Sequence, residues 1–296
     1  MSNKPIYIVG GRKAFNNPEV YNRGVVLLKD DSGISTVTEY ITPTELNPFG
    51  KNVIFKGATR ADDKLYCCTQ NEVVVFALPN FEQVAHYSHP LFAGIHSVIP
   101  LADGSFLAGA AVLDSVLLVD IQGNVTEIHN IIEEENVVDV NIDYRFTSQL
   151  PSEAHMNHMV DVNGEIFVTR LKKKDAVSLT DVSRKIDIAT ERAHDGFLFD
   201  SNLYFTTVDG TIVVVDPATL SVTDQYTLNT FAPSWCRGLF VDTESSWVGY
   251  TRRFEAGLDV APTRISRYSQ PDWMLWDEID LEPYGMDAIY SIIDAS

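Results

Sequence analysis

Short apolar runs rich in Val, Ile, Tyr and Phe recur along the chain, and polar turn-forming residues separate them. In residues 194–226 such runs are separated by turns at 200–202, 209–210 and 216–218. Apolar runs of this length between Asp-Gly and Pro-containing turns are typical of β-strands joined by tight hairpins. Residues 194–226 are therefore predicted to form one four-stranded antiparallel sheet, the repeating unit of a β-propeller.

The same order of strands and turns recurs in copies that begin near Lys56, His96, His158 and Arg237. The chain ends with residues 287–293, which read as a first strand without successors, and its beginning supplies strands without a first one. Pairing of the two ends completes a sixth unit and removes exposed sheet edges. We therefore predict an all-β fold, one domain over residues 1–296. This is a six-bladed β-propeller of four-stranded antiparallel blades, its ring closed by the N- and C-terminal strands.

The repeat resembles the six-bladed propellers grouped as gluconolactonase-like and TolB-like proteins, over essentially the whole chain. The resemblance is architectural. Gluconolactonase-like members hold a divalent metal with Glu, Asn and Asp at the mouth of the central channel. The corresponding positions of this sequence carry His, Lys and Arg. The chemistry of that family is therefore not expected here.

The first strand of each blade lines the channel, so equivalent positions in different copies are expected to form a ring. Alignment on the aromatic residue of the second strand, followed by counting back toward the first, gives Lys56, His96, Asn157, His194 and Arg237. A shorter turn in the third copy makes His158 the expected equivalent in place of Asn157. In the terminal blade the corresponding residue is Asp287.

Three imidazoles in consecutive blades predict a metal site. His96, His158 and His194 are the expected ligands of a divalent transition metal, Zn²⁺, Mn²⁺, Fe²⁺ or Ni²⁺, with positions left open for water or substrate. Without a metal, the same histidines and Asp287 could act as acid and base groups near neutral pH. The alternative for each residue is a polar side chain that only caps the start of a strand.

The two cations of the ring predict an anionic ligand. Lys56 and Arg237 are expected to hold a carboxylate or a phosphate, and Asp287 is expected to act as a base, to orient a His or to complete the metal shell. The structural alternative is that acids such as Asp195, Asp287 or Glu282 neutralise these cations. Long connections at residues 10–23, 133–157, 170–175 and 251–262 are expected to form a binding rim, with variable decoration as the alternative.

Two further motifs are weaker candidates. His155 and His158 are spaced for a second metal site only if their segment were helical, and the sequence around them is poorly helical. Cys236 stands next to Arg237 and could be an activated thiolate, with a small buried side chain as the alternative.

The net charge of −19 and the pI near 4.6 argue against nucleic acid or an anionic membrane as the main partner. The chain has no apolar run long enough for a transmembrane helix, and its first residues do not resemble a signal peptide. Three cysteines give no even disulfide framework, so we expect a reducing cytoplasm.

Together these features predict an enzyme that acts on a small anionic metabolite at a His-rich, metal-dependent site. Hydrolysis, elimination as in a lyase, and isomerisation all remain open. The alternative is a non-catalytic binding or scaffold propeller that recognises a protein or small-molecule partner.

Overall fold

The computed structural model describes residues 4–15, 17–47, 53–133, 138–146, 152–188, 191–228, 234–253 and 261–296. Regular structure in these segments is β-strand, with three short 3-10 helices at Thr44–Leu46, Tyr144–Phe146 and Glu282–Tyr284. Chain contacts divide the molecule into two compact units: unit 1 comprises residues 1–55 and 194–296, and unit 2 comprises residues 56–193. The expectation of a single domain stays a prediction. No helix of the described residues is long and apolar enough to cross a membrane.

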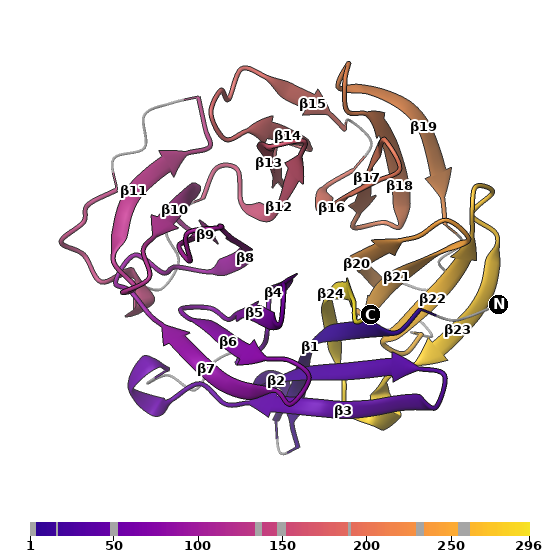
Figure 1. The fold of residues 1–296 in the computed structure, drawn as a ribbon, viewed down its shortest axis with the longest axis horizontal. Helices are drawn as coiled ribbons and strands as arrows, with labels where there is room; N and C mark the ends of the chain where they lie inside the picture. Colours follow the sequence, from indigo (N-terminus) through magenta and orange to yellow (C-terminus); the bar gives the residue numbers. More distant parts are fainter. Residues whose placement is uncertain are drawn as a thin grey trace. The chain divides into compact units, whose positions relative to one another are not determined.

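Unit 1 holds three four-stranded antiparallel sheets, each drawn strand by strand in Figure 1. In strand order they are β24 (Ala288–Asp294), β1 (Ile6–Ala14), β2 (Asn17–Asp30) and β3 (Gly33–Tyr40); β16 (Ala193–Phe199), β17 (Asn202–Thr207), β18 (Thr211–Asp216) and β19 (Ser221–Thr227); and β20 (Ser234–Val241), β21 (Ser245–Arg252), β22 (Arg264–Ser269) and β23 (Leu275–Asp280).

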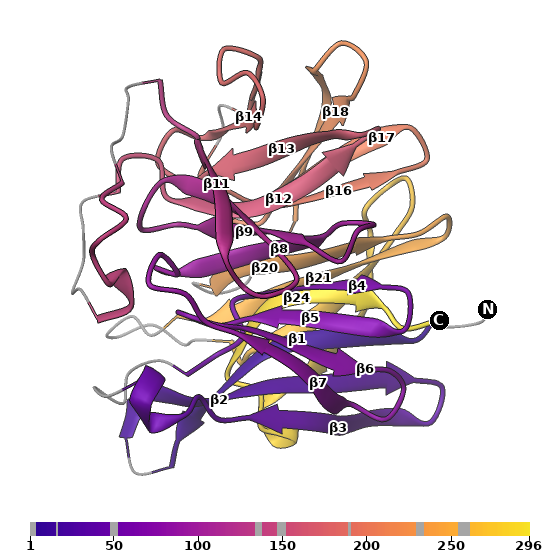
Figure 2. The same cartoon turned by 60° about the vertical axis from the view of Figure 1, so that its left-hand side comes forward.

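Unit 2 holds three sheets of the same kind. They are β4 (Gly57–Ala61), β5 (Lys64–Cys68), β6 (Val73–Ala77) and β7 (Glu82–Tyr87); β8 (Ile95–Pro100), β9 (Phe106–Ala110), β10 (Ser115–Val119) and β11 (Val125–Asn130); and β12 (Met156–Val162), β13 (Glu165–Arg170), β14 (Asp175–Ser178) and β15 (Lys185–Asp187). Figure 2 shows how β8 and β9 run alongside each other within this unit.

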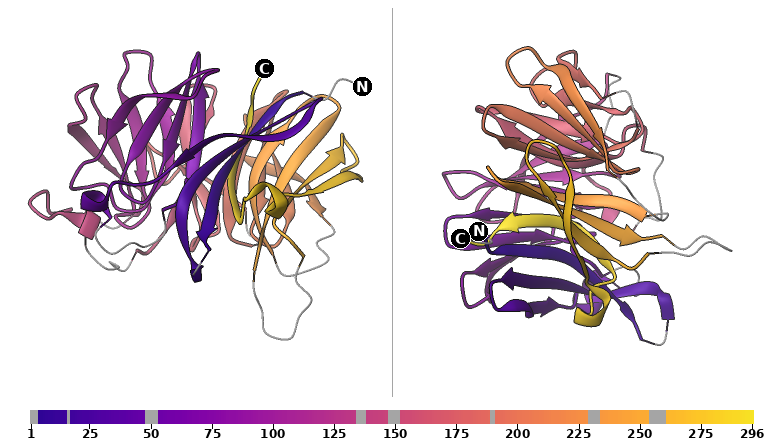
Figure 3. Two further views of the ribbon diagram at one scale, coloured as in Figure 1. Left: turned by 90° about the horizontal axis from the view of Figure 1, so that it is seen from below. Right: turned by 90° about the vertical axis from the view of Figure 1, so that its right-hand side faces the viewer.

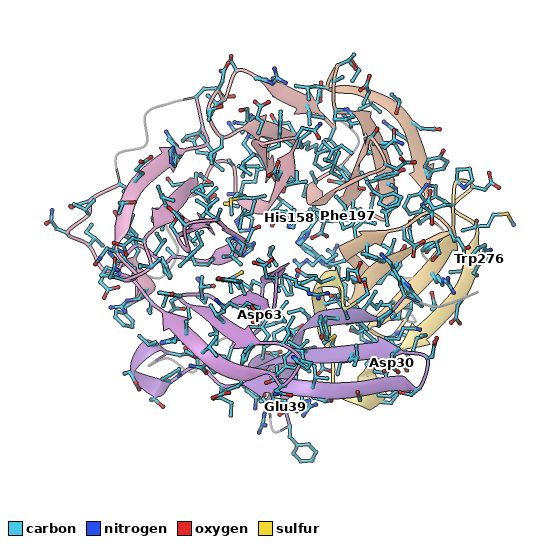
Figure 4. The ribbon with its side chains drawn as sticks, viewed as in Figure 1. Asp30, Glu39, Asp63, His158, Phe197 and Trp276 are labelled. Atoms are coloured by element: carbon cyan, nitrogen blue, oxygen red, sulfur yellow. The ribbon has the colours of Figure 1, made fainter. Side chains whose placement is uncertain are left out.

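Burial changes in the same way across each sheet. In the sheet of residues 193–227, β18 is almost wholly buried, whereas β19 is mostly exposed. Glu39 and Trp276 lie on the outermost strands β3 and β23 of their sheets, while His158 lies on β12, the first strand of its sheet (Figure 4). The fourth strand is polar because it is exposed to solvent, and the middle strands are continuously apolar because they are buried.

The hydrophobic core lies between neighbouring sheets within each unit. In unit 1, Ile8 and Val25 of the terminal sheet pack with Phe240, Trp247 and Ile292 in one buried cluster. In unit 2, a comparable cluster joins residues of the β4–β7 and β8–β11 sheets. Six four-stranded antiparallel sheets with cores between them are the blades of a six-bladed β-propeller, so the predicted fold class is confirmed.

The two ends of the chain share one sheet. Strand β24 pairs with β1 in antiparallel register from Ile6 opposite Asp294 to Gly11 opposite Ala288. Lys4 Nζ lies 2.9 Å from Asp294 Oδ2, and Figure 3 shows β24 and β1 side by side in the same sheet. The predicted completion of a blade by the C-terminal strand is confirmed.

The prediction of a long loop over residues 10–23 is wrong. These residues continue β1 and β2 as a hairpin, with Arg12 opposite Arg23 and Lys13 opposite Tyr21. The segment from Arg170 to Asp175 is a tight turn between paired residues. Parts of the expected rim, residues 134–137, 147–151 and 254–260, lie outside the described residues. The hairpin places Tyr21, which the sequence did not single out, opposite Lys13 of β1.

Removal of residues 284–296 is expected to give insoluble protein. The deletion strips β24 from β1 and exposes the edge of a central apolar strand, which is a template for aggregation. Sedimentation of the soluble fraction and thermal unfolding check the result. The control is Lys4→Ala, which removes an exposed ion pair and a cation–π contact with Phe240, and which is expected to change stability by about 1 kcal/mol or less. A truncated protein that stays monomeric with an unchanged Tm would contradict the role given to β24.

Candidate functional site

A β-bulge interrupts the first strand in four of the sheets whose register is described. The shifts lie between Ile95 and Ser97, Met156 and Met159, Cys236 and Leu239, and Ile289 and Ser291. The residues at these bulges are His96, Asn157 with His158, Arg237 with Gly238, and Tyr290. Because a bulge re-aims side chains locally, the polar positions found by alignment coincide with irregular backbone.

The terminal sheet places Tyr290 at its bulge, whereas counting along the sequence had given Asp287. Asp287 precedes β24, and its Oδ2 accepts a hydrogen bond from Lys13 N at 2.8 Å. The position equivalent to His96 and Arg237 is therefore Tyr290. A chemical role for Asp287 stays a prediction.

In unit 1, His194 is held by its neighbour Asp195. His194 Nδ1 lies 3.1 Å from Asp195 Oδ2, and both side chains are buried. A carboxylate can only accept, so Nδ1 carries the proton and Nε2 presents a lone pair. Burial lowers the pKa of His194; Asp195 opposes this effect, and Arg237 adds to it. His194 is thus a neutral imidazole in one fixed tautomer.

Arg237 lies between two aromatic rings of the same unit. Its Cζ is 4.6 Å from the ring centre of Trp235 and 4.4 Å from that of Tyr290. Each contact of this kind contributes about 0.5–2 kcal/mol, depending on how far water is excluded. Both rings therefore contact the guanidinium by cation–π interaction, which helps to hold the side chain in place.

No carboxylate of the described residues forms an ion pair with Arg237. Asp195 Oδ2 is occupied by other donors, and Glu282 pairs with Arg252 at 2.8 Å. The side chain of Arg237 is partly exposed, yet its Nε is buried and has no hydrogen-bond acceptor among the described residues. The structural alternative, in which acids neutralise Arg237, therefore finds no partner there. A buried N–H without an acceptor is costly, and a ligand or water can relieve that cost.

Tyr21 lies close to the same groups. Burial raises the pKa of its phenol well above the ordinary value, and the charges of Tyr290 and Asp287 raise it further. The charge of Arg237 opposes this shift. Tyr21 consequently stays protonated at neutral pH and offers an O–H donor. Sequence reasoning missed Tyr21 because it treated its segment as a loop.

A glycine permits the backbone of Arg237 to approach the next strand. A Cβ at Gly249 on β21 would overlap the carbonyl oxygen of Arg237. Gly57 stands in the same relation to the carbonyl oxygen of His96 in unit 2. Backbone atoms cannot move aside as a flexible side chain can, so these two positions require glycine.

In unit 2, His96 is the centre of a chain of hydrogen bonds. Asn157 Nδ2 donates to Ala193 O at 3.0 Å, so its Oδ1 accepts from His96 Nδ1 at 3.3 Å. His96 Nε2 then presents its lone pair to Lys56 Nζ, 3.4 Å away, and Lys56 also donates to Gln70 Oε1. Both ring nitrogens of His96 are engaged. The neighbour that reaches His96 is Asn157, where the sequence had favoured His158.

His155 is a second imidazole beside His96. Their ring centres are 5.2 Å apart in an edge-to-face arrangement. Asp114 holds the segment before β12, because its carboxylate accepts hydrogen bonds from Ser152 Oγ and from the backbone N–H groups of residues 153–155. His155 has a positive φ of 52°, a conformation that few side chains adopt. The Asp114 contacts offset the cost of this backbone and fix the ring next to His96.

The predicted metal ligands are divided between the units, with His96 and His158 in unit 2 and His194 in unit 1. Over the described residues, no group of three or more His, Cys, Asp or Glu is placed to hold a metal ion. Metal binding at His96 would require release of a nitrogen from Lys56 or Asn157. The shared metal site and the common level of the six predicted residues stay predictions.

Cys236 is buried, and burial raises the pKa of its thiol well above the ordinary value. The thiolate is the nucleophilic form, so this residue is not activated in the state described. Cys236 packs with Leu239 and Tyr250 in a buried cluster. Its role beside Arg237 is packing.

No protein-family model matches the chain, and no curated protein matches it. Solved structures do. A protein of unknown function from Bacteroides caccae aligns with a TM-score of 0.67 at 12% identity, over 98% of both chains. A protein chain from a nidogen/laminin complex aligns with a TM-score of 0.59 at 10% identity, over 97% of both chains. Streptogramin B lyase aligns with a TM-score of 0.54 at 12% identity, over 95% of this chain and 84% of the lyase. At such identities the similarity shows the fold alone.

Gly249→Ala is expected to destabilise the protein by about 1–3 kcal/mol, the usual cost of overpacking. The added methyl group meets the Arg237 carbonyl, so the Arg237 Nε–H resonance is expected to shift as well. Chemical unfolding and side-chain ¹⁵N NMR measure the two effects. Gly164→Ala is the matched control, because Gly164 has a positive φ of 91° with open space around it. That variant should lose stability and leave the Arg237 signal in place.

Metal analysis of protein purified without a His tag tests the expected metal. Near-stoichiometric Zn, Mn, Fe or Ni, lost on single His96→Ala or His194→Ala substitution, is the outcome expected from three histidine ligands. Protein that is free of metal after purification and fails to take up any of the four ions in equilibrium dialysis would contradict the expectation.

Proposed function

We propose that the protein is an enzyme acting on a small anionic metabolite, whose carboxylate or phosphate group binds Arg237. The observation that carries this proposal is the buried Nε of Arg237, which has no acceptor among the described residues. An anion that reaches the exposed edge of the guanidinium lies alongside Nε and supplies the acceptor. Such charge-assisted bonds are about twice as strong as neutral ones.

The aromatic contacts determine how the anion can bind. Trp235 and Tyr290 both lie against the guanidinium, and we propose that the ligand approaches along the edge that these rings leave open. Two oxygens of a carboxylate or phosphate match the in-plane N–H pair, a fit that lysine cannot reproduce. The ring contacts also hold the side chain in place before binding, which reduces the entropy lost on association.

Acid–base groups beside Arg237 support a catalytic role over simple binding. His194 is neutral with its tautomer fixed, and Tyr21 is a protonated phenol. A neutral imidazole can accept a proton from a ligand, and a phenol can donate a hydrogen bond to a developing oxyanion. His194 is only 2% exposed, so the ligand must displace covering side chains to reach it. Hydrolysis, elimination and isomerisation are all compatible with these groups.

The remaining expectations belong to the same proposal. A divalent metal remains part of the proposal, and so do ligand-binding or catalytic roles for Lys56, His158 and Asp287. A cytoplasmic location is supported by the three cysteines, all of which are free and buried thiols. The alternative is a non-catalytic binding propeller. It accounts for anion binding by Arg237 but gives no chemical role to a neutral His194 held by the buried Asp195.

Side-chain ¹⁵N NMR tests the proposed anion site directly. Inorganic phosphate and acetate, titrated separately, are expected to shift the Nε–H signal of Arg237. Arg267 is the matched control: its guanidinium also lies over two rings, Trp247 at 5.7 Å and Trp276 at 5.4 Å, and its signal should not move.

The corresponding variants are Arg237→Met and Arg267→Met, which keep apolar bulk between the rings. Arg237→Met is expected to fold normally and to weaken anion binding by about 2–5 kcal/mol, the cost of removing one member of a buried charged pair. Arg267→Met should bind as the wild type does. Equal responses of Arg237 and Arg267 to both anions, or unchanged binding by Arg237→Met, would defeat the proposal.

A further inference from the structure

A single carboxylate oxygen gathers three donors from three strands of unit 1. Asp195 Oδ2 accepts from His194 Nδ1 at 3.1 Å, from Thr206 Oγ1 at 3.1 Å and from Gly238 N at 2.6 Å. These donors belong to β16, β17 and β20. Asp195 is 5% exposed, so the bonds form away from bulk water, where each is stronger than at the surface.

The first of these bonds determines the state of His194. A carboxylate opposite Nδ1 leaves Nε2 as the basic nitrogen of the ring. Loss of the Asp195 carboxylate would remove the acceptor that favours the Nδ1–H tautomer of His194. The side chain of Asp195 therefore decides which nitrogen of His194 can receive a proton.

The third bond determines the position of Arg237. Gly238 N belongs to the bulge of β20, where the backbone has a positive φ of 83° and a Cβ would come within 3.0 Å of Ile292 Cγ1. Asp195 Oδ2 closes this bulge, and the bulge directs Arg237 between Trp235 and Tyr290. These three hydrogen bonds of Asp195 Oδ2 go to His194, Thr206 and the Gly238 N–H, and none of them goes to the guanidinium of Arg237. The guanidinium is thereby left for a ligand.

We propose that Asp195 is the positioning residue of this site, and that its Oδ2 fixes both the His194 tautomer and the Arg237 bulge. The inference rests on the proposed function, because there His194 is the proton acceptor and Arg237 binds the anion. Positioning requires an acceptor oxygen and does not require the negative charge. Asp195→Asn should therefore preserve what Asp195→Ala removes.

Two readouts test the proposal. Imidazole ¹⁵N shifts report the tautomer of His194, and the affinity for inorganic phosphate reports the position of Arg237. Asp195→Asn is expected to keep a single Nδ1–H tautomer and an affinity within about threefold of wild type. Asp195→Ala is expected to show both tautomers and at least tenfold weaker phosphate binding, a loss of about 1.4 kcal/mol or more.

Thr206→Val is the matched control. It removes another buried donor from the same oxygen, so it should lower Tm while leaving the tautomer and the phosphate affinity unchanged. If Asp195→Ala does not fold, Gly238→Ala replaces it. That variant disturbs the bulge, so it should weaken phosphate binding and leave the His194 tautomer as in wild type.

The outcomes separate the two proposals. Wild type that binds no phosphate and no acetate would overturn the anion site, yet the tautomer in Asp195→Ala and Asp195→Asn would still decide the role of Asp195. A folded Asp195→Ala that keeps one tautomer and full affinity would overturn the positioning role. Equal losses in Thr206→Val and Asp195→Ala, or unchanged affinity in Gly238→Ala, would also overturn it.

Discussion

The antiparallel pairing of β24 with β1 is the interaction on which the site of unit 1 depends. It covers an apolar strand that would otherwise be a sheet edge, and it brings Ile289 and Ile292 into the core with Phe240. The same pairing sets the register that leaves Tyr290 at a bulge. Tyr290, near the end of the chain, thus contacts Arg237, and Ile6 near its beginning shares one apolar cluster with Ile292.

The strand pattern was predictable because it depends on local alternation of apolar and turn residues, and the completion of the terminal blade followed from it. The site was harder to predict. Counting from the second strand gave His96, Asn157, His194 and Arg237, and the residue that contacts His96 is the counted Asn157 and not the adjusted choice, His158. A signal for Tyr290 was present, because Ile289–Ile293 repeats the pattern of Ile95–Ile99 with Tyr in place of His.

The contacts of Asp195 and Asp114 could not be derived from the sequence. Asp195 accepts a hydrogen bond from Gly238 N, and Asp114 accepts from Ser152 and the backbone that follows it. Each pair is about 40 residues apart in the sequence, so the contact depends on how different strands are placed. Nothing in the local sequence distinguishes these aspartates from those that close surface turns, such as Asp120. A buried carboxylate with several donors becomes visible only when the strands are in place.

The contact between Lys4 and Asp294 has a consequence for the order of the chain itself. Because Lys4 contacts Asp294, a short flexible peptide could connect the end of β24 to the start of β1 without stretching the terminal sheet. New ends could then be opened at the turn around Gly164, where the space beside the backbone is empty. In such a permuted chain, β24 and β1 would become a continuous hairpin. The terminal blade would then be formed by neighbours in sequence, and closing it would cost less chain entropy.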